Sequence, residues 1–334
     1  MFNISCNYQI IIDKENEFIA RVKPTEKFQV ETINAYGERF ENIYELMKVI
    51  SHKNEGKHHH PLTGPIYIEN AMPGDVIKVH IYKINIEEMG QSLSKTAGIE
   101  PIRNSDIENR APIIPKRISE NEINYNGMKL EYKPMIGIVA TTPNNGKIKT
   151  GHASLRNGGN LDLPFVTENT DIYLPVDIEG AGLYLGDVHG AQGYGELSGI
   201  ALEASSKIVI DVEVLKPKEL FDNILIIGKE PFSQKDCIGI VGIGGIMKIE
   251  DAIKDAFQGS YNVIKQLIPE MKKNRIKTLI TVIGNSFNGQ AFSTTSESTS
   301  MIVITKDDIK RISKKEIEKV LFYFWKEWRI WKKL

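Results

Sequence analysis

The stretch MPGDVIKVHIYKINI, residues 72–86, decides the class of fold. A Pro-Gly pair that is typical of a turn precedes a run in which β-branched residues alternate with polar ones. The first two thirds of the chain hold further runs of this kind: FIARVK (18–23), FQVETI (28–33), PIYIEN (65–70), DIYLPVDI (171–178) and KIVIDVEV (207–214). Short strands punctuated by glycine-rich and Pro-Gly turns predict a mainly β fold, a sandwich or barrel, and not alternating βαβ units.

The character of the sequence changes near residue 215. Beyond it, IEDAIKDAFQGSYNVIKQLIPEMKK (249–273) predicts a helix, because apolar residues recur there at helical spacing. Three apolar runs are typical of buried strands: NILIIG (223–228), CIGIVGIGGI (237–246) and TLITVIG (278–284). We therefore predict an α+β protein with a β-rich core over residues 1–215, which carries the site, and an α/β region over residues 216–334.

The chain ends in KKEIEKVLFYFWKEWRIWKKL (314–334), which holds all 3 tryptophans. As a helix, this segment places Ile317, Leu321, Phe324, Trp328 and Trp331 along one side, with lysines around them. Such a helix either docks on the body of the protein or on a second subunit, or lies on a membrane surface. Docking is favoured, because the rest of the sequence shows no membrane feature.

Composition narrows the classes of function. The 334 residues carry 42 Lys and Arg against 43 Asp and Glu, and this balance gives no electrostatic footprint for nucleic acid. The amino terminus lacks the pattern of a signal peptide, and no uncharged apolar run is long enough to cross a bilayer. Cys6 and Cys237 lie far apart, which excludes a cysteine metal knuckle and gives no sign of a disulfide framework. We expect a cytoplasmic protein.

Side chains that can bind a metal or transfer a proton are concentrated around GDVHGAQGYGE, residues 186–196. Asp187 and His189 are two residues apart, so in an extended segment both side chains project to one face and can reach one ion. Carboxylate and imidazole ligands suit zinc, manganese or another divalent ion, and a nearby glutamate would take a proton from water. The local pattern leaves a second interpretation open, in which the pair is merely hydrogen-bonded and the glycines mark turns. The same region also offers His152, Asp162, Glu196 and Glu203.

Other motifs carry less chemistry. Of the adjacent His58, His59 and His60, we expect His60 to line a site, because it precedes the rigid turn PLTGP (61–65). The glycine-rich segments match neither a dinucleotide fingerprint nor a P-loop, and no nucleophile elbow is present. Cys237 is expected to be a buried thiol, and the run STTSESTS (293–300) a solvated loop.

Several blocks together resemble the acetamidase/formamidase family in order and spacing. They are PLTGPIYIENAMPGDVIKVHI (61–81), KPMIGIVATTP (133–143), GGNLD (158–162), IYLPVDIEGAGLYLGDVHGAQGYGE (172–196) and ALEAS (201–205), with VETINAYGE (30–38) a weaker match. The resemblance covers roughly residues 25–215 and fades toward the carboxyl end. Ordered blocks with similar intervals are far more specific than any one of them.

The resemblance implies an amidohydrolase that cleaves a short aliphatic amide, such as formamide or acetamide, to the carboxylate and ammonia. It also implies a β-rich homo-oligomer, with a dimer favoured, and a bound divalent metal, for which zinc is the usual suggestion. Carried over by position, Asp162, Asp187 and His189 are the expected metal ligands and Glu196 the proton-transferring base. Backbone N–H groups of GGN (158–160) are expected to stabilise the oxyanion. The expected substrate-lining residues are His60, Glu69, Gly158, Gly159, Asn160, Gln192 and Glu203.

Three positions depart from the pattern of the family. Asn157 stands where many members have a histidine, and Tyr194 and Asn34 stand where aspartates are common. Each substitution removes a potential charged ligand. The sequence therefore leaves two outcomes open: a metal site of altered composition, or a non-catalytic member that binds a small polar ligand or metal.

Overall fold

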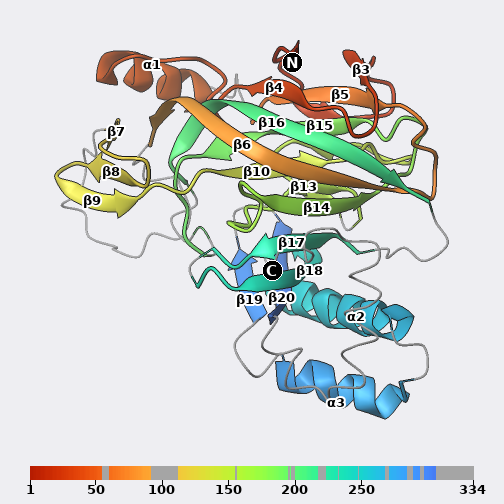
Figure 1. Cartoon of the computed structure of the whole chain (residues 1–334). Helices are drawn as coiled ribbons and strands as arrows, with labels where there is room; N and C mark the ends of the chain where they lie inside the picture. Colours follow the sequence, from red (N-terminus) through yellow and green to blue (C-terminus); the bar gives the residue numbers. More distant parts are fainter. Residues whose placement is uncertain are drawn as a thin grey trace.

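The computed structural model describes residues 1–54, 60–91, 112–154, 156–194, 196, 200–216, 223–231, 233–246, 248–267, 271–283, 289–293 and 297–305. Within these residues a 15-stranded sheet dominates the molecule (Figure 1). The prediction of a mainly β fold with an α/β part toward the carboxyl end is confirmed. The predicted terminal helix, 314–334, lies outside the described residues.

The pairing of β6 (Val76–Gly90) with β16 (Glu203–Leu215) forms the middle of this sheet. The two strands are antiparallel and stay paired from one end of β6 to the other. Ile77 and Val79 of β6 are buried, whereas Lys78 between them is partly exposed. The alternation in the stretch 72–86 therefore determines which face of the strand meets the core.

The sheet branches at β15 (Leu183–His189), which pairs with three strands. Its partners are β10 (Met135–Ala140), β16 and β5 (Leu62–Ile68), and every residue of β15 is buried. The main path runs β12 (Ala153–Ser154), β13 (Gly158–Asn160), β10, β15, β16, β6, β14 (Thr170–Pro175), β17 (Leu225–Lys229), β18 (Asp236–Ile246), β20 (Glu297–Thr305) and β19 (Gly289–Ser293).

Shorter strands complete the β structure at its margins. β4 (Phe28–Thr32) pairs with β16, and β1 (Phe2–Ile4) and β3 (Ala20–Val22) pair in parallel with β4 and β5. Two small sheets lie apart from the large one: β2 (Ile11–Ile12) with β11 (Ile148–Lys149), and β7 (Lys116–Arg117), β8 (Glu122–Tyr125) and β9 (Met128–Glu131).

Strands on both sides of residue 215 share the large sheet. β14 pairs with β17, so that Tyr173 lies opposite Leu225. Figure 1 shows β17–β20 with α2 (Ile249–Leu267) and α3 (Lys273–Ile283) on one side of the β-rich body. The division into parts at residue 215 stays a prediction.

The C-terminal helices differ in part from the sequence prediction. α2 begins where predicted but ends at Leu267 and not at residue 273. The sequence has a proline at position 269, and a proline disfavours helical backbone at the residue before it. The strand predicted over TLITVIG (278–284) is wrong, since residues 278–283 lie in α3. Ile276 and Ile280 are buried one helical turn apart, while Lys277 and Thr278 are exposed. This amphipathic spacing outweighs the β-branched content of the run.

The sequence analysis missed α1 (Ile43–Asn54). Asn42 caps it, because its Oδ1 accepts hydrogen bonds from the N–H groups of Tyr44 and Glu45, both at 3.1 Å. The Glu45 carboxylate reaches back to the N–H of Glu41 at 2.7 Å. An asparagine followed three residues later by glutamate is a recognisable start signal for a helix.

The packing of α2 on β18 predicts one strongly destabilising substitution. A Cβ at Gly242 of β18 would lie 2.2 Å from the Ala256 N and 2.3 Å from the Ala252 O of α2. Gly242→Ala should therefore lower the free energy of unfolding by about 1–3 kcal/mol, measured by urea unfolding at unchanged m-value. Gly193→Ala is the control, because nothing lies within 4 Å of a Cβ there. Equal stability of both variants would contradict this packing.

Candidate metal centre

The candidate site forms where β15 meets β10 and β16. Asp187 and His189 come from β15, and His189 lies in register between Met135 of β10 and Glu203, the first residue of β16. Asp162 follows β13. The side chains of Asp162, Asp187, His189 and Glu203 are buried, each with at most 3% of its residue surface exposed.

The side chains that the sequence predicted to converge do lie together. Ligand atoms of Asp162, Asp187 and His189 lie within 4.8 Å of one another, as do those of His189, Glu196 and Glu203. The His189 Nε2 atom lies 3.5 Å from both an Asp187 oxygen and a Glu203 oxygen. Their role as metal ligands stays a prediction.

Left-handed backbone brings these side chains inward. The φ angles of His60, Asp162, Asp187 and Glu196 are 45°, 47°, 53° and 38°, a region that residues other than glycine seldom adopt. Asp187 is therefore not in the extended conformation from which we predicted that it shares a face with His189. Each such residue costs on the order of 1–3 kcal/mol, so the surrounding fold must hold it in place.

Gln192 orients the imidazole of His189. The Gln192 Nε2 group donates to the Asp162 carbonyl at 2.6 Å, so its Oε1 is left to accept from the His189 Nδ1–H, also at 2.6 Å. When the imidazole is neutral, these bonds assign the tautomer in which Nε2 carries the lone pair and faces the carboxylates. Sequence reasoning placed Gln192 among substrate-lining residues, whereas in the structure its contacts are to His189 and Asp162.

Gly137 of β10 is a site residue that the sequence analysis missed. A Cβ there would lie 2.8 Å from the Asp162 Oδ1 and 2.9 Å from the Asp187 Oδ2. The absence of a side chain thus leaves the space into which both carboxylates turn. The only available signal was a glycine inside the apolar run MIGIVA (135–140), which marks close approach of another group.

Burial and charge shift the protonation equilibria of the site. Its cluster of titratable side chains consists of Asp162, Asp187, His189, Glu196 and Glu203. Burial, with the charges of Glu196 and Asp187, raises the pKa of Asp162 well above its usual range. Burial also opposes ionisation of Asp187, but His60 and His189 outweigh it and hold the pKa of Asp187 well below its usual range. Burial raises the pKa of Glu196 as well.

His189 is charged more readily than an ordinary histidine. Burial alone would lower the pKa of His189, but the carboxylates of Glu203 and Asp187 outweigh burial and raise it well above the usual value. His60 lies at the edge of the cluster, with its Nδ1 atom 2.9 Å from the Asp187 Oδ1. A buried group of carboxylates around one imidazole is a candidate site for a cation.

The remaining predicted residues lie at different distances from the cluster. Gly158, Gly159 and Asn160 form β13, and the Asn160 N–H donates to the His152 carbonyl at 3.0 Å, so this group is not free to stabilise an oxyanion. Glu69 follows β5 at the end far from the cluster, roughly 20 Å along the strand from Leu62, which lies opposite Gly186.

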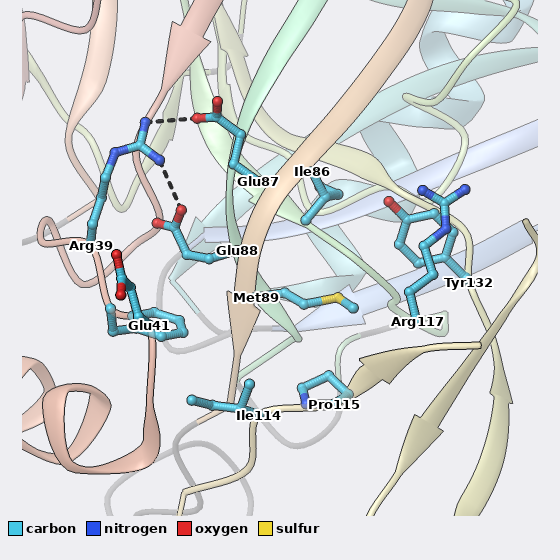
Figure 2. A pocket seen from close by; sticks show the side chains of 11 residues that line it. Arg39, Glu41, Ile86, Glu87, Glu88, Met89, Ile114, Pro115, Arg117 and Tyr132 are labelled. Carbon is cyan, nitrogen blue, oxygen red and sulfur yellow. Dashed lines mark hydrogen bonds and ion pairs between the residues drawn. The ribbon is translucent and has the colours of Figure 1, made fainter. Parts of the chain in front are cut away.

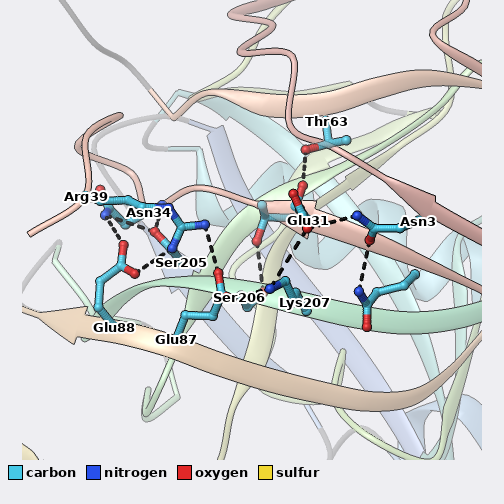
Figure 3. Close-up of polar contacts among 12 residues, drawn as sticks. Asn3, Glu31, Asn34, Arg39, Thr63, Glu87, Glu88, Ser205, Ser206 and Lys207 are labelled. Carbon is cyan, nitrogen blue, oxygen red and sulfur yellow. Dashed lines mark hydrogen bonds and ion pairs between the residues drawn. The ribbon is translucent and has the colours of Figure 1, made fainter.

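The three departures from the family pattern lie outside the two ligand groups. Asn34 is buried, and its amide nitrogen contacts the Ser205 Oγ at 3.1 Å and the Glu88 Oε1 at 3.3 Å (Figure 3). Asn157 donates to the Asp177 Oδ2 at 3.1 Å. The Tyr194 hydroxyl donates to Glu230.

A separate pocket of about 530 Å³ lies beside Glu88 (Figure 2). Arg39 lines one side and pairs with Glu87 and Glu88, both at 2.8 Å. On the other side, the Arg117 guanidinium lies over the Tyr132 ring, 4.5 Å from its centroid. None of the cluster residues lines this pocket.

The solvated loop that we expected over STTSESTS (293–300) is wrong for the residues of the run that the structure describes; 294–296 lie outside them. Ser293 ends β19 and residues 297–300 belong to β20, in which Thr299 and Ser300 are buried. The Thr299 Oγ1 donates to the Leu161 carbonyl at 3.1 Å, directly before Asp162. The serine and threonine content of the run favoured a loop, although residues 297–300 form part of a strand that packs beside the site.

A model of the acetamidase/formamidase family matches residues 13–149 and 145–290, which is more than half of the chain. The chain belongs to the acetamidase/formamidase family. The resemblance predicted from the sequence is thus confirmed, and membership classes the chain with hydrolases that act on amides. The match continues well past residue 215, where the resemblance of the quoted blocks fades.

Solved structures with this family's names share the fold. The acetamidase of Bacillus halodurans covers 97% of this chain and 99% of its own, with TM-score 0.71 and 22% identity. An acetamidase/formamidase of Thermoanaerobacter tengcongensis covers 93% and 98%, with TM-score 0.72 and 24% identity. A Schizosaccharomyces pombe protein with formamidase in its name is 41% identical over 61 residues, a match that spans 18% of this chain and 15% of that protein.

Within the described part of the chain, no helix combines the length and the apolar character that crossing a bilayer requires.

The pKa directions predict how the chelator-treated protein responds to pH. The folded state raises the pKa of His189 above 6.5, so the stability from its charged form is complete below pH 6.5 and is lost as pH rises through the folded pKa. The raised pKa of Asp162 acts with the same sign, whereas Asp187, whose pKa is lowered, contributes constant stability in this window. The melting temperature should therefore fall as pH rises above 6.5.

Added zinc should oppose this fall, because a metal competes with protons for the same atoms. His189→Asn should flatten the pH dependence in chelator. His80→Asn is the control, since His80 pairs with Asp171 at 2.6 Å outside the cluster. A chelator-treated protein whose melting temperature rises over this range would contradict the assignment.

Proposed function

We propose that the protein is a metal-dependent amidohydrolase that cleaves a short aliphatic amide of the formamide or acetamide type to the carboxylate and ammonia. The observation that carries the proposal is the convergence of Asp162, Asp187 and His189 within 4.8 Å in a buried site, in a member of this family. A localisation in the cytoplasm and assembly as a homodimer stay predictions.

The residues present fit a divalent cation. The Asp162 Oδ1 is buried and has no hydrogen-bond partner among the described residues, and Gln192 turns the His189 lone pair toward the carboxylates. Asp162, Asp187 and His189 would hold the ion, with Glu203 beside His189 as a further oxygen donor. Nitrogen and carboxylate donors of this kind suit zinc. When bound, a divalent cation polarises an amide carbonyl and lowers the pKa of water.

Glu196 is the residue we assign to proton transfer. It lies in the same group as His189 and Glu203, but it is partly exposed where those two are buried, so water and substrate can reach it. Burial raises its pKa, which favours both accepting a proton from water and returning it to the departing nitrogen. That return is required because an unprotonated amide ion is a poor leaving group.

The side-chain oxygen of Asn160 is an argument for a substrate that carries N–H groups. Its Oδ1 is buried and lacks a hydrogen-bond partner among the described residues, two positions before Asp162. An unpaired buried acceptor is unfavourable unless something donates to it. The N–H₂ group of a primary amide would supply such a donor.

Ammonia release tests the proposal directly. Purified protein should contain stoichiometric metal and release ammonia from formamide, acetamide or propionamide. Chelation should abolish the release, and zinc should restore it. Protein that binds metal but releases no ammonia from any of them would instead support the alternative, a non-catalytic member that binds a small polar ligand or metal.

Glu196→Gln should lower kcat by about two or more orders of magnitude, because the amide side chain cannot accept the proton. Its zinc content should stay that of the unmodified protein, since the proposed ligands are unchanged. Glu213→Gln is the matched control, because Glu213 pairs with Lys78 away from the cluster. Full activity of Glu196→Gln would place the base elsewhere.

A further inference from the structure

We propose that the β17–β18 hairpin positions Glu196 for proton transfer, through a hydrogen bond from Tyr194 to Glu230. The inference rests on the proposed role of Glu196 and adds positioning residues from the C-terminal part of the chain. Neither Tyr194 nor Glu230 belongs to the two ligand groups, so they act through the loop that carries Glu196.

The loop between β15 and β16 needs anchors of this kind. Backbone hydrogen bonds join the two ends of the loop, from the Gly190 N–H to the Leu202 carbonyl at 2.8 Å and from the Leu202 N–H to the Ala191 carbonyl at 3.4 Å. Glu196 lies between these ends with a left-handed φ of 38°. Side chains, and not a strand ladder, must therefore hold the described part of the loop in place.

Gln192 and Tyr194 hold the loop from two sides. Gln192 binds His189 and the Asp162 carbonyl, which fixes the first half of the loop to the cluster. The Tyr194 ring packs against buried Phe165, with centroids 5.9 Å apart, and its hydroxyl donates to the Glu230 Oε1. Tyr194 therefore lies between the core and the hairpin, two residues before Glu196.

Glu230 is itself ordered by the turn in which it lies. Its Oε2 accepts from the Ser233 N–H, its own N–H donates to the Lys235 carbonyl at 2.8 Å, and its carbonyl accepts from the Gln234 N–H at 2.9 Å. One carboxylate oxygen thus closes the turn and the other receives Tyr194. An acceptor fixed in this way restrains its donor at little further loss of entropy.

Lys133 makes a second, independent connection between the same two segments. Its N–H donates to the Gly190 carbonyl at 3.2 Å, at the start of the loop, and its ammonium donates to the Pro231 carbonyl at 2.6 Å, next to Glu230. The hairpin is therefore joined to the loop directly by Tyr194 and indirectly through Lys133. With Thr299 bound to the Leu161 carbonyl, the C-terminal part supports the site from both the Glu196 and the Asp162 sides.

A base must lie within hydrogen-bond reach of the proton it takes, and small displacements reduce the rate steeply. Tyr194→Phe should therefore lower kcat on the order of tenfold to a hundredfold, with little change in KM or in zinc affinity. A merely structural role would instead lower the melting temperature and the zinc affinity together. Tyr67→Phe is the matched control, because it removes a tyrosine–glutamate hydrogen bond of 2.7 Å to Glu179, near the end of β5 that lies away from the cluster.

Hydrogen exchange of the peptide 190–196 supplies a readout that does not require turnover. Tyr194→Phe and Glu230→Ala should each increase its exchange on the order of tenfold. The double variant should add little, because both substitutions remove the same hydrogen bond, that between Tyr194 and Glu230. Unchanged exchange and kcat in Tyr194→Phe, or effects equal to those of Tyr67→Phe, would overturn the inference. If the unmodified protein hydrolyses no amide, the proposed function fails, while the exchange measurement still tests the anchoring.

Discussion

The structure depends on the burial of several carboxylates around a single imidazole. Asp162, Asp187 and Glu203 surround His189 within a few ångströms, and all of these side chains are buried. Like charges at this separation repel strongly in a low dielectric, and the desolvation of each carboxylate opposes folding further. His189 and His60 offset this repulsion in part, and a divalent cation would offset it more completely. The surrounding sheet, in which β15 pairs with three strands, supplies the rigidity that such an arrangement requires.

The sequence predicted the β structure well because strand formation in this chain is a local pattern. The alternation in residues 72–86 corresponds directly to the buried and exposed faces of β6. α3 was misjudged because a run rich in isoleucine and threonine is compatible with either element, whereas the burial of Ile276 and Ile280 one helical turn apart favours the helix. α1 was missed although Asn42 and Glu45 form a visible capping pair. STTSESTS (293–300) misled because burial of a hydroxyl depends on a partner such as Leu161, which the sequence does not reveal.

For the site, the motifs identified which residues meet but not how they meet. Asp162, Asp187 and His189 were named correctly as a converging group, yet the reason given, an extended strand, does not apply to Asp187. The bridging role of Gln192 and the open space at Gly137 depend on atoms that lie far apart in the chain. Such features follow from the approach of β10, β13 and β15 to one another, and no spacing within the sequence encodes that approach.

The shared sheet across residue 215 also limits how the chain can be divided. β17 covers the hydrogen-bonding edge of β14 from Asp171 to Tyr173, so a fragment that stops at residue 216 would expose that edge. A bare strand flanked by apolar residues invites pairing with other chains, and aggregation follows. The amino-terminal portion, although it holds every proposed ligand, therefore depends on the carboxyl-terminal portion for its solubility as well as for its geometry.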